Sequence, residues 1–330
     1  MRLCWCCRLV LLAALASLVA PLPAHAQSGE IPHVGFLNST SPAVYAFNAE
    51  AFRDGLKQEG FVDGRNMVIE YRWAGDVYDR LPALAAELVG RHVAVIAATG
   101  DLASALAAKK ATTTIPIVFT VGSDPVDFGL VGSLSRPGGN ATGITLFSST
   151  LTQKRMEVLN ALVPKGAPIA LLMNPDNVNA VTDQQHAEAA ARVLGHPAFV
   201  VHARRAADLA AAFTAVRGRR AGAVLVASDP TFLGLRKDLV AGAAHLAIPV
   251  VYFAREFAQA GGLVSYGTSV TWMYRQAGIY CGHILKGAKP AELPVLQPST
   301  FELVVNLRTA RNLGLVIPQS LLIRADEIIN

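Results

Sequence analysis

Strand-like and helix-like segments alternate along this chain of 330 residues, and the alternation limits the folds that it can adopt. Apolar side chains at helical spacing mark the helices, whereas short apolar or alternating runs mark the strands. In the first half we predict strands at 33–37, 68–73, 93–98 and 117–119, and helices at 46–59, 81–89 and 102–111. Repeated strand–helix–strand units predict an α/β fold with a mostly parallel sheet and helices on both faces.

The same alternation starts again in the second half. We predict strands at 169–173, 198–202, 223–227 and 250–253, and helices at 184–194, 208–216 and 235–244. Residues 92–98 and 115–119 match residues 221–227 and 248–252, with a polar turn and a helix between the two runs in each case. This match indicates one structural unit used once in each of two lobes, although an Ile-Pro before a buried strand also recurs by chance.

Composition agrees with two lobes of ordinary size. Apolar residues make up 52% of the chain, charged residues 16% and aromatic residues 7%. Such a mixture, rich in Ala, Val, Leu and Ile, is typical of buried parallel strands covered by helices. About 300 residues suffice for two domains with separate cores.

The N-terminus has the three parts of a secretory signal, which we predict over residues 1–26. Arg2 and Arg8 supply the positive start, residues 9–19 are apolar, and cleavage is expected after Ala26. Of the four cysteines only Cys281 then remains, so no internal disulfide is possible. Removal of the two arginines lowers the net charge from +5 to +3, too mild a charge to favour nucleic-acid binding. We therefore expect an exported, periplasmic protein.

Polar turns follow the predicted strands of both halves. In open parallel sheets ligands bind beyond the carboxyl ends of the strands, where these turns lie. The candidate ligand-binding residues are Asn38, Ser39, Thr40, Ser41, Tyr45, Thr99, Gly100, Asp101, Gly122, Ser123, Asp124, Asn174, Asp229, Phe253, Arg255 and Tyr266.

These residue types suit a small polar solute. Backbone N–H groups at helix starts favour a carboxylate, and Asp101 or Asp229 can meet an ammonium. The three aromatic candidates can enclose an apolar part of the solute. The alternatives stay open: Ser, Thr, Asn and Asp at such positions also cap helices, aromatics also fill cores, and Arg255 can pair with a solute carboxylate, with Glu256 or with a partner in the other lobe.

Sequence motifs for several kinds of chemistry are absent. The chain has no G-x-S-x-G elbow, no phosphate-binding G-x-x-x-x-G-K-[ST] loop and no G-x-G-x-x-G after its first strand. Its histidines show no metal-ligand spacing. We therefore expect no catalytic residue, metal or cofactor.

Several longer stretches resemble the ABC-transporter substrate-binding proteins of the tryptophan/tyrosine-receptor type. They cover nearly all of the predicted mature chain and include residues 71–74, 78–89, 111–119, 123–126, 129–143, 255–257, 260–268, 284–295 and 301–306. The resemblance implies a type I periplasmic-binding fold, with a cleft between two lobes that close on a hinge. It also implies uptake of an amino-acid-like or aromatic carboxylate solute, delivered to an inner-membrane permease and its ATPase.

The resemblance further implies that the chain crosses between the lobes three times, near Phe147, Tyr266 and Val295. The first lobe would comprise residues 32–147 and 267–294, and the second residues 148–266 and 295–330. We expect a monomer. Asp101 departs from the family pattern, which leaves open whether it binds a solute amine or caps a helix. An exported enzyme that uses the same cleft, or a sensor subunit for a membrane signalling partner, stays an alternative.

Overall fold

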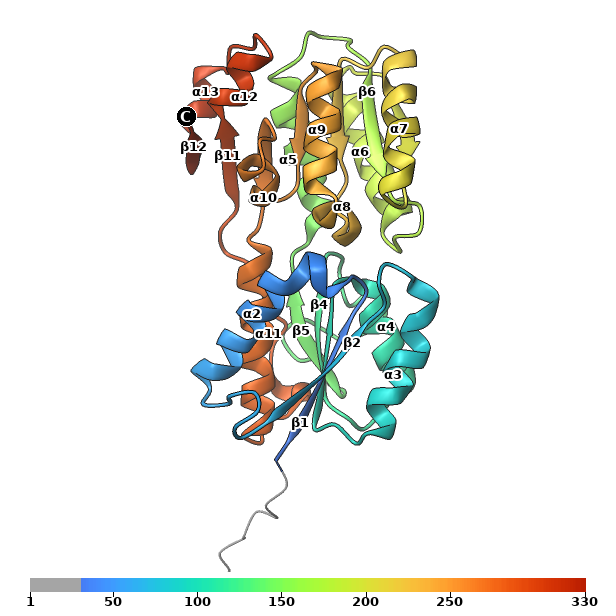
Figure 1. The fold of residues 1–330 in the computed structure, drawn as a ribbon, viewed down its shortest axis with the longest axis vertical. Helices are drawn as coiled ribbons and strands as arrows, with labels where there is room; N and C mark the ends of the chain where they lie inside the picture. Colours follow the sequence, from blue (N-terminus) through green and yellow to red (C-terminus); the bar gives the residue numbers. More distant parts are fainter. Residues whose placement is uncertain (1–30) are drawn as a thin grey trace, which may run out of the picture. The chain divides into compact units, whose positions relative to one another are not determined.

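The computed structural model describes residues 31–330, without the side chains of 149 and 150, so the predicted signal sequence lies outside the described residues. Within residues 31–330 the strands form two sheets (Figure 1). The first contains β1 (His33–Asn38), β2 (Val68–Trp73), β3 (Val95–Thr99), β4 (Ile117–Val121) and β5 (Ala141–Thr145). The second contains β6 (Ile169–Met173), β7 (Ala198–His202), β8 (Ala223–Val226), β9 (Val250–Tyr252), β10 (Val264–Gly267), β11 (Glu302–Asn306) and β12 (Glu327–Ile329).

The two sheets share one strand order. The first runs β2-β1-β3-β4-β5, and the second runs β7-β6-β8-β9-β10 before β11 and β12 extend it. All pairings are parallel except β10 with β11. In each sheet the order reverses beside the first strand, at β1/β3 and at β6/β8, and such a reversal opens a crevice at the carboxyl ends of the strands. The predicted α/β fold with two lobes of parallel strands is confirmed, and the matched segments of the two halves are β3–β4 and β8–β9.

Helices cover both faces of each sheet, and Figure 1 shows α2 and α11 on one side of the first sheet with α3 and α4 on the other. Residues of α7, α9 and α10 pack on one face of the second sheet, and those of α5 and α6 on the other. The bounds are α2 (Pro42–Gln58), α3 (Leu81–Gly90), α4 (Leu102–Ala111), α5 (Ser148–Asn160), α6 (Ala180–Leu194), α7 (Ala206–Gly218), α8 (Pro230–Gly234), α9 (Arg236–Leu246), α10 (Arg255–Gln259), α11 (Val270–Leu285), α12 (Leu307–Asn312) and α13 (Gln319–Leu322), with short 3₁₀ turns at Tyr78–Arg80 and Pro290–Glu292.

Helix α11 follows the second sheet in the chain but packs on the first lobe. It lies so close to α2 that a Cβ at Gly278 would stand 2.1 Å from the Phe52 carbonyl oxygen, and one at Gly55 would stand 2.0 Å from that of Arg275. Glycine at both positions therefore permits the contact. This packing places the N-terminal end of α11 beside the carboxyl ends of β3 and β4, where the pocket described below lies.

Three stretches of chain join the two sheets. One follows β5 and passes through Phe147, which has a left-handed backbone with φ of 45°. The second joins β10 to α11, and the third leads to β11 after Leu296, which forms a bridge with Ile144. The lobe boundaries given above stay a proposal. Several elements were not predicted from the residue pattern, among them α5, α10 and the antiparallel β11.

Candidate functional site

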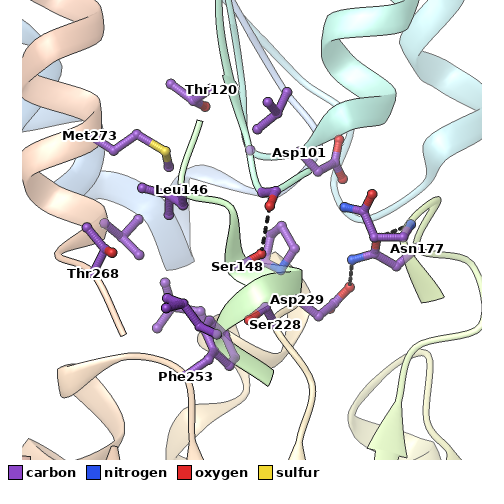
Figure 2. A pocket seen from close by; sticks show the side chains of 18 of the residues that line it. Asp101, Thr120, Leu146, Ser148, Asn177, Ser228, Asp229, Phe253, Thr268 and Met273 are labelled. Atoms are coloured by element: carbon purple, nitrogen blue, oxygen red, sulfur yellow. Dashed lines mark hydrogen bonds between the residues drawn. The ribbon is translucent and has the colours of Figure 1, made fainter. Parts of the chain in front are cut away.

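A pocket of about 70 Å³ lies where the strand ends of the two sheets face each other (Figure 2). Its walls come from the ends of β3, β4, β5 and β8, from the start of α5, and from the loop and first turn of α11. The lining residues are Tyr45, Gly100, Asp101, Thr120, Val121, Gly122, Leu146, Ser148, Leu151, Arg155, Asn177, Asn179, Ser228, Asp229, Pro230, Leu233, Phe253, Thr268, Val270, Met273 and Tyr274. Both lobes therefore contribute to one site.

Asp101 enters the pocket two residues after β3 ends. Its Oδ1 caps helix α4 by accepting from the Ser104 amide at 3.1 Å and the Ser104 hydroxyl at 3.3 Å. Its Oδ2 is buried and makes no hydrogen bond of regular geometry within the described residues, although the Ser39 and Tyr78 hydroxyls lie near enough to favour the charged form. Burial nevertheless raises the pKa of Asp101 above its usual range.

Asp229 takes the equivalent place after β8. Its Oδ1 caps α8 by accepting from the Phe232 amide at 3.1 Å. The side-chain amide of Asn177 donates to Oδ2 at 2.7 Å, and that of Asn174 lies 3.3–3.4 Å from both oxygens. Burial raises the pKa of Asp229 to about 6 against these donors, and repulsion from Asp101 adds to the rise. The carboxyl groups of Asp101 and Asp229 are therefore close enough to interact electrostatically across the pocket.

An asparagine with the same turn stands at the end of the first strand of each lobe, as the last residue of β1 and directly after β6. Asn38 Oδ1 accepts from the backbone amide of Thr40 at 2.8 Å, and Asn174 Oδ1 accepts from that of Asp176 at 3.1 Å. Such Asx turns direct the chain without a helix cap. Asn38 Nδ2 then donates to the hydroxyls of Thr99 and Tyr274, which fixes the wall of the pocket behind β1.

Arg155 is a cation of the pocket lining, and it is 2% exposed. Its guanidinium donates to the carbonyl oxygens of Tyr266 and Ser148 and to the Ser228 hydroxyl, at 2.8, 3.3 and 3.0 Å. Burial lowers its pKa to about 10, while the charge of Asp183 opposes that shift. Arg155 thus connects α5 to the ends of β8 and β10, and it forms the floor of the pocket on the side of the second lobe.

The pocket has a charged side and an apolar side. Figure 2 shows Asp101, Asn177 and Asp229 on one side of the view and Leu146 and Met273 on the other. Two hydroxyls of the lining, those of Thr120 and Thr268, are buried without a partner among the described residues. Buried hydroxyls are normally hydrogen-bonded, so these groups are available to a bound molecule.

The residues predicted to bind the ligand fall into three groups according to where they lie relative to the pocket. Those in the lining are Tyr45, Gly100, Asp101, Gly122, Asp229 and Phe253. Those that support the lining are Asn38, Ser39, Thr40, Ser41, Thr99 and Asn174. Gly100 needs its φ of 99°, and a Cβ there would stand 2.5 Å from Ser39 Oγ.

The remaining candidates lie elsewhere. Ser123 and Asp124 line an adjoining cavity with Gly122. Arg255 forms hydrogen bonds with Glu302 and Glu327 in the second lobe rather than with Glu256 or across the lobes. The Tyr266 ring lies near Phe301, outside the pocket lining.

Sequence reasoning did not select the residues that α5 and α11 bring to the pocket, such as Ser148, Arg155, Thr268 and Met273. An arginine inside a polar helix gives no signal of burial, and α11 reaches the site only through its packing on α2. Asn177 and Ser228 lie in the polar turns that follow predicted strands, so the positions of those turns could have identified them.

Among residues 31–330, no cluster of His, Cys, Asp and Glu has the makings of a metal site. In the same described part, no helix has the length and apolar character needed to cross a membrane.

A model of the ABC transporter substrate binding protein family matches residues 40–329. The chain belongs to this family. The predicted resemblance is thereby confirmed, because the match covers most of the chain.

The substrate-binding protein is similar to proteins of known structure and name. It is 25% identical to a tyrosine-binding protein of Clostridioides difficile over 81% of this chain and 76% of the relative. It also matches a conserved domain protein from Vibrio cholerae (TM-score 0.82, 27% identity) and an ABC domain from Streptococcus pneumonia in complex with L-Trp (TM-score 0.81, 25% identity). Each structural match covers 91% of this chain and 100% of the other.

The family establishes the general role of the protein. It is a substrate-binding protein of ABC transport with the type I periplasmic-binding fold. Family members bind a small-molecule ligand, act with a permease and an ATPase, and are generally extracytoplasmic.

Proposed function

We propose that this protein is the periplasmic solute receptor of an ABC uptake system and captures a small amino-acid-like solute with an apolar or aromatic part. The pocket carries this proposal, because polar and apolar groups from both lobes line it together. The named ligands of the relatives, tyrosine and L-Trp, are of the same class. The predicted site residues in the lining are the proposed contacts.

The size of the pocket implies movement of the lobes. A dry cavity of about 150 Å³ holds benzene, so a pocket of about 70 Å³ is too small for an aromatic solute without widening. We infer that the lobes part to admit the solute and close on it through the three connecting stretches. The closed, solute-bound form is then the form presented to the permease as a monomer.

The composition of the lining supports capture without catalysis. Among the described residues of the lining, the serine hydroxyls are those of Ser148 and Ser228, and neither a histidine nor a cysteine accompanies them. Nucleophilic catalysis by serine needs an adjacent base. Cys281 is fully buried in α11, where burial raises the pKa of its thiol.

The test is to purify residues 27–330, unfold the protein to release carried-over solute, and identify that solute by mass spectrometry. The refolded protein should bind it in calorimetry with 1:1 stoichiometry and melt at a higher temperature, because the solute stabilises the native form. Thr268→Trp, which fills the pocket, should abolish binding, whereas Val193→Trp on the exposed face of α6 should not. If no solute is released and a broad metabolite screen finds no binding, the proposed function is wrong.

A further inference from the structure

The charges in the pocket lining do not balance. Among the residues that the structure describes, the lining contains two carboxyl groups, Asp101 and Asp229, and one cation, Arg155. Arg155 already donates to three acceptors of the second lobe, and its charge interacts electrostatically with Asp183. Neither pocket aspartate forms an ion pair in the part of the chain that the structure describes. Two buried carboxylates that face each other without a cation are costly.

Helix capping alone does not account for these two aspartates. A neutral side chain caps a helix equally well, and this chain uses Ser269 to cap α11 and Asn306 to cap α12. Capping also occupies only Oδ1 of Asp101, and the buried Oδ2 makes no regular hydrogen bond to any residue that the structure describes. The negative charge therefore fits a partner that enters the pocket.

An adjoining cavity continues the same electrostatic pattern. It shares Gly122 and Asn179 with the pocket, its titratable lining residues are Asp124, Asp127 and His186, and within the described residues no Lys or Arg lines it. A space lined by one sign of charge concentrates ligands of the opposite sign. The Asp124 and Asp127 carboxylates beside the pocket therefore also favour a cation.

We propose that the solute carries a positively charged amino group that lies between Asp101 of the first lobe and Asp229 of the second. This inference rests on the proposed function and narrows the class of solute. The apolar body of the solute would lie against Leu146 and Met273, on the side away from the two aspartates (Figure 2). The buried hydroxyls of Thr120 and Thr268 would bind a polar group at the far end of that body. The amino group is the required anchor, whereas a carboxylate is dispensable.

Three probes with one ring separate these requirements: tyramine, which lacks the carboxylate, 3-(4-hydroxyphenyl)propionate, which lacks the amine, and tyrosine. Calorimetry on the stripped protein at neutral pH should detect tyramine and no binding of the propionate. Binding of the propionate as tight as that of tyramine, or release of a carried-over solute without an amine, overturns the inference and leaves the proposed function intact. If neither these probes nor any solute of the metabolite screen binds, both the inference and the proposed function are wrong.

Asp101→Asn separates the charge from the cap. Asparagine caps helices as well as aspartate does, so the variant should fold, while affinity for tyramine should fall about tenfold or more. Asp238→Asn, at an exposed position in the first turn of α9, is the matched control and should bind as the wild type does. Wild-type affinity of the Asp101→Asn protein would show that Asp101 only caps α4.

Discussion

The two lobes use the same turn at the same place but hold their aspartates differently. Each first strand leads into an Asx turn formed by a buried asparagine, and each third strand leads to an aspartate that caps a helix. In the second lobe, Asn174 and Asn177 direct their amides at Asp229. In the first lobe, the Asn38 amide instead donates to Thr99 and Tyr274, and one oxygen of Asp101 makes no regular hydrogen bond within residues 31–330.

This difference assigns separate roles to the two aspartates. Asp229 is fixed by side-chain amides before any solute arrives, whereas Asp101 has an acceptor to spare. A carboxylate that is already held in place, such as that of Asp229, costs little free energy to orient when the solute binds. A carboxylate oxygen without a hydrogen bond, such as that of Asp101, gains more free energy from the new contact. The second lobe thus provides the prepared surface, and the first lobe completes it on closure.

The largest effect should come from the floor of the second lobe. Arg155→Met leaves the three acceptors of the guanidinium unpaired, so the free energy of unfolding should fall by about 3–5 kcal/mol. Denaturant unfolding measures the loss. The matched control is Arg204→Met, which breaks an exposed pair with Asp176 and should cost no more than about 1 kcal/mol. Equal losses in the two variants would contradict the structural role of Arg155.

The next effect is a pH dependence that arises from Asp229. Its pKa rises from 3.8 to about 6 on folding, so the native state binds the proton more tightly. The stability that this proton contributes to the solute-free protein is fully present below pH 3.8 and is lost as the pH rises through about 6. The contribution amounts to about 3 kcal/mol. Thermal unfolding of the wild type should therefore show a downward step between pH 4 and 7.

Asp229→Asn should remove this step and make the solute-free protein more stable at pH 7. Asp101→Asn should make the fall in melting temperature between pH 4 and 7 smaller, because the charge of Asp101 raises the pKa of Asp229. A wild type and an Asp229→Asn variant with parallel pH profiles would show that Asp229 does not titrate in this range.

A smaller effect is expected in the first lobe. Tyr274→Phe removes an acceptor of the Asn38 amide, which lies 2.8 Å from the tyrosine oxygen in a buried setting. The unfolding free energy should fall by about 1–2 kcal/mol. Tyr71→Phe removes an exposed hydrogen bond to Arg53 and is the control, with little change expected. If the two variants unfold alike, the Asn38 network does not stabilise the wall of the pocket.

The smallest effect concerns contact between the lobes. The Thr231 hydroxyl of the second lobe donates to Asp76 of the first at 3.1 Å. Thr231→Val should cost about 0.5–1.5 kcal/mol and favour the open form of the solute-free protein. Small-angle scattering should show a larger radius of gyration than for the wild type or for Thr214→Val, a change at an exposed position of α7. An unchanged radius would show that this hydrogen bond does not hold the lobes together.

Local pattern predicted much of the fold. The strands at residues 68–73, 169–173 and 198–202 and the helix at 102–111 have the predicted bounds, because turns and caps delimit them sharply. Helix α5 was missed, since its polar sequence lacks a clear apolar stripe and its burial depends on packing against α6. The antiparallel β11 comes from a late segment of the chain and carries no local sign of its direction.

The site was predictable only where it follows from strand ends. Asp101 and Asp229 stand at such ends, and sequence alone predicts that position. Met273 and Thr268 reach the pocket through the glycine-permitted contact of α11 with α2, which joins residues more than 200 positions apart. Arg255 has the residue type of a ligand contact, yet two nearby glutamates pair with it. Such choices of partner depend on the tertiary structure.

The most direct test of the account is a double-mutant cycle on tyramine affinity across the pocket, with Asp101→Asn, Asp229→Asn and the double variant measured by calorimetry at neutral pH. If one solute amine lies between the two carboxylates, each single variant loses about tenfold or more in affinity, and the double variant loses clearly less than the product of the two. Losses that multiply independently, or a single variant with wild-type affinity, would contradict a shared amine between the lobes.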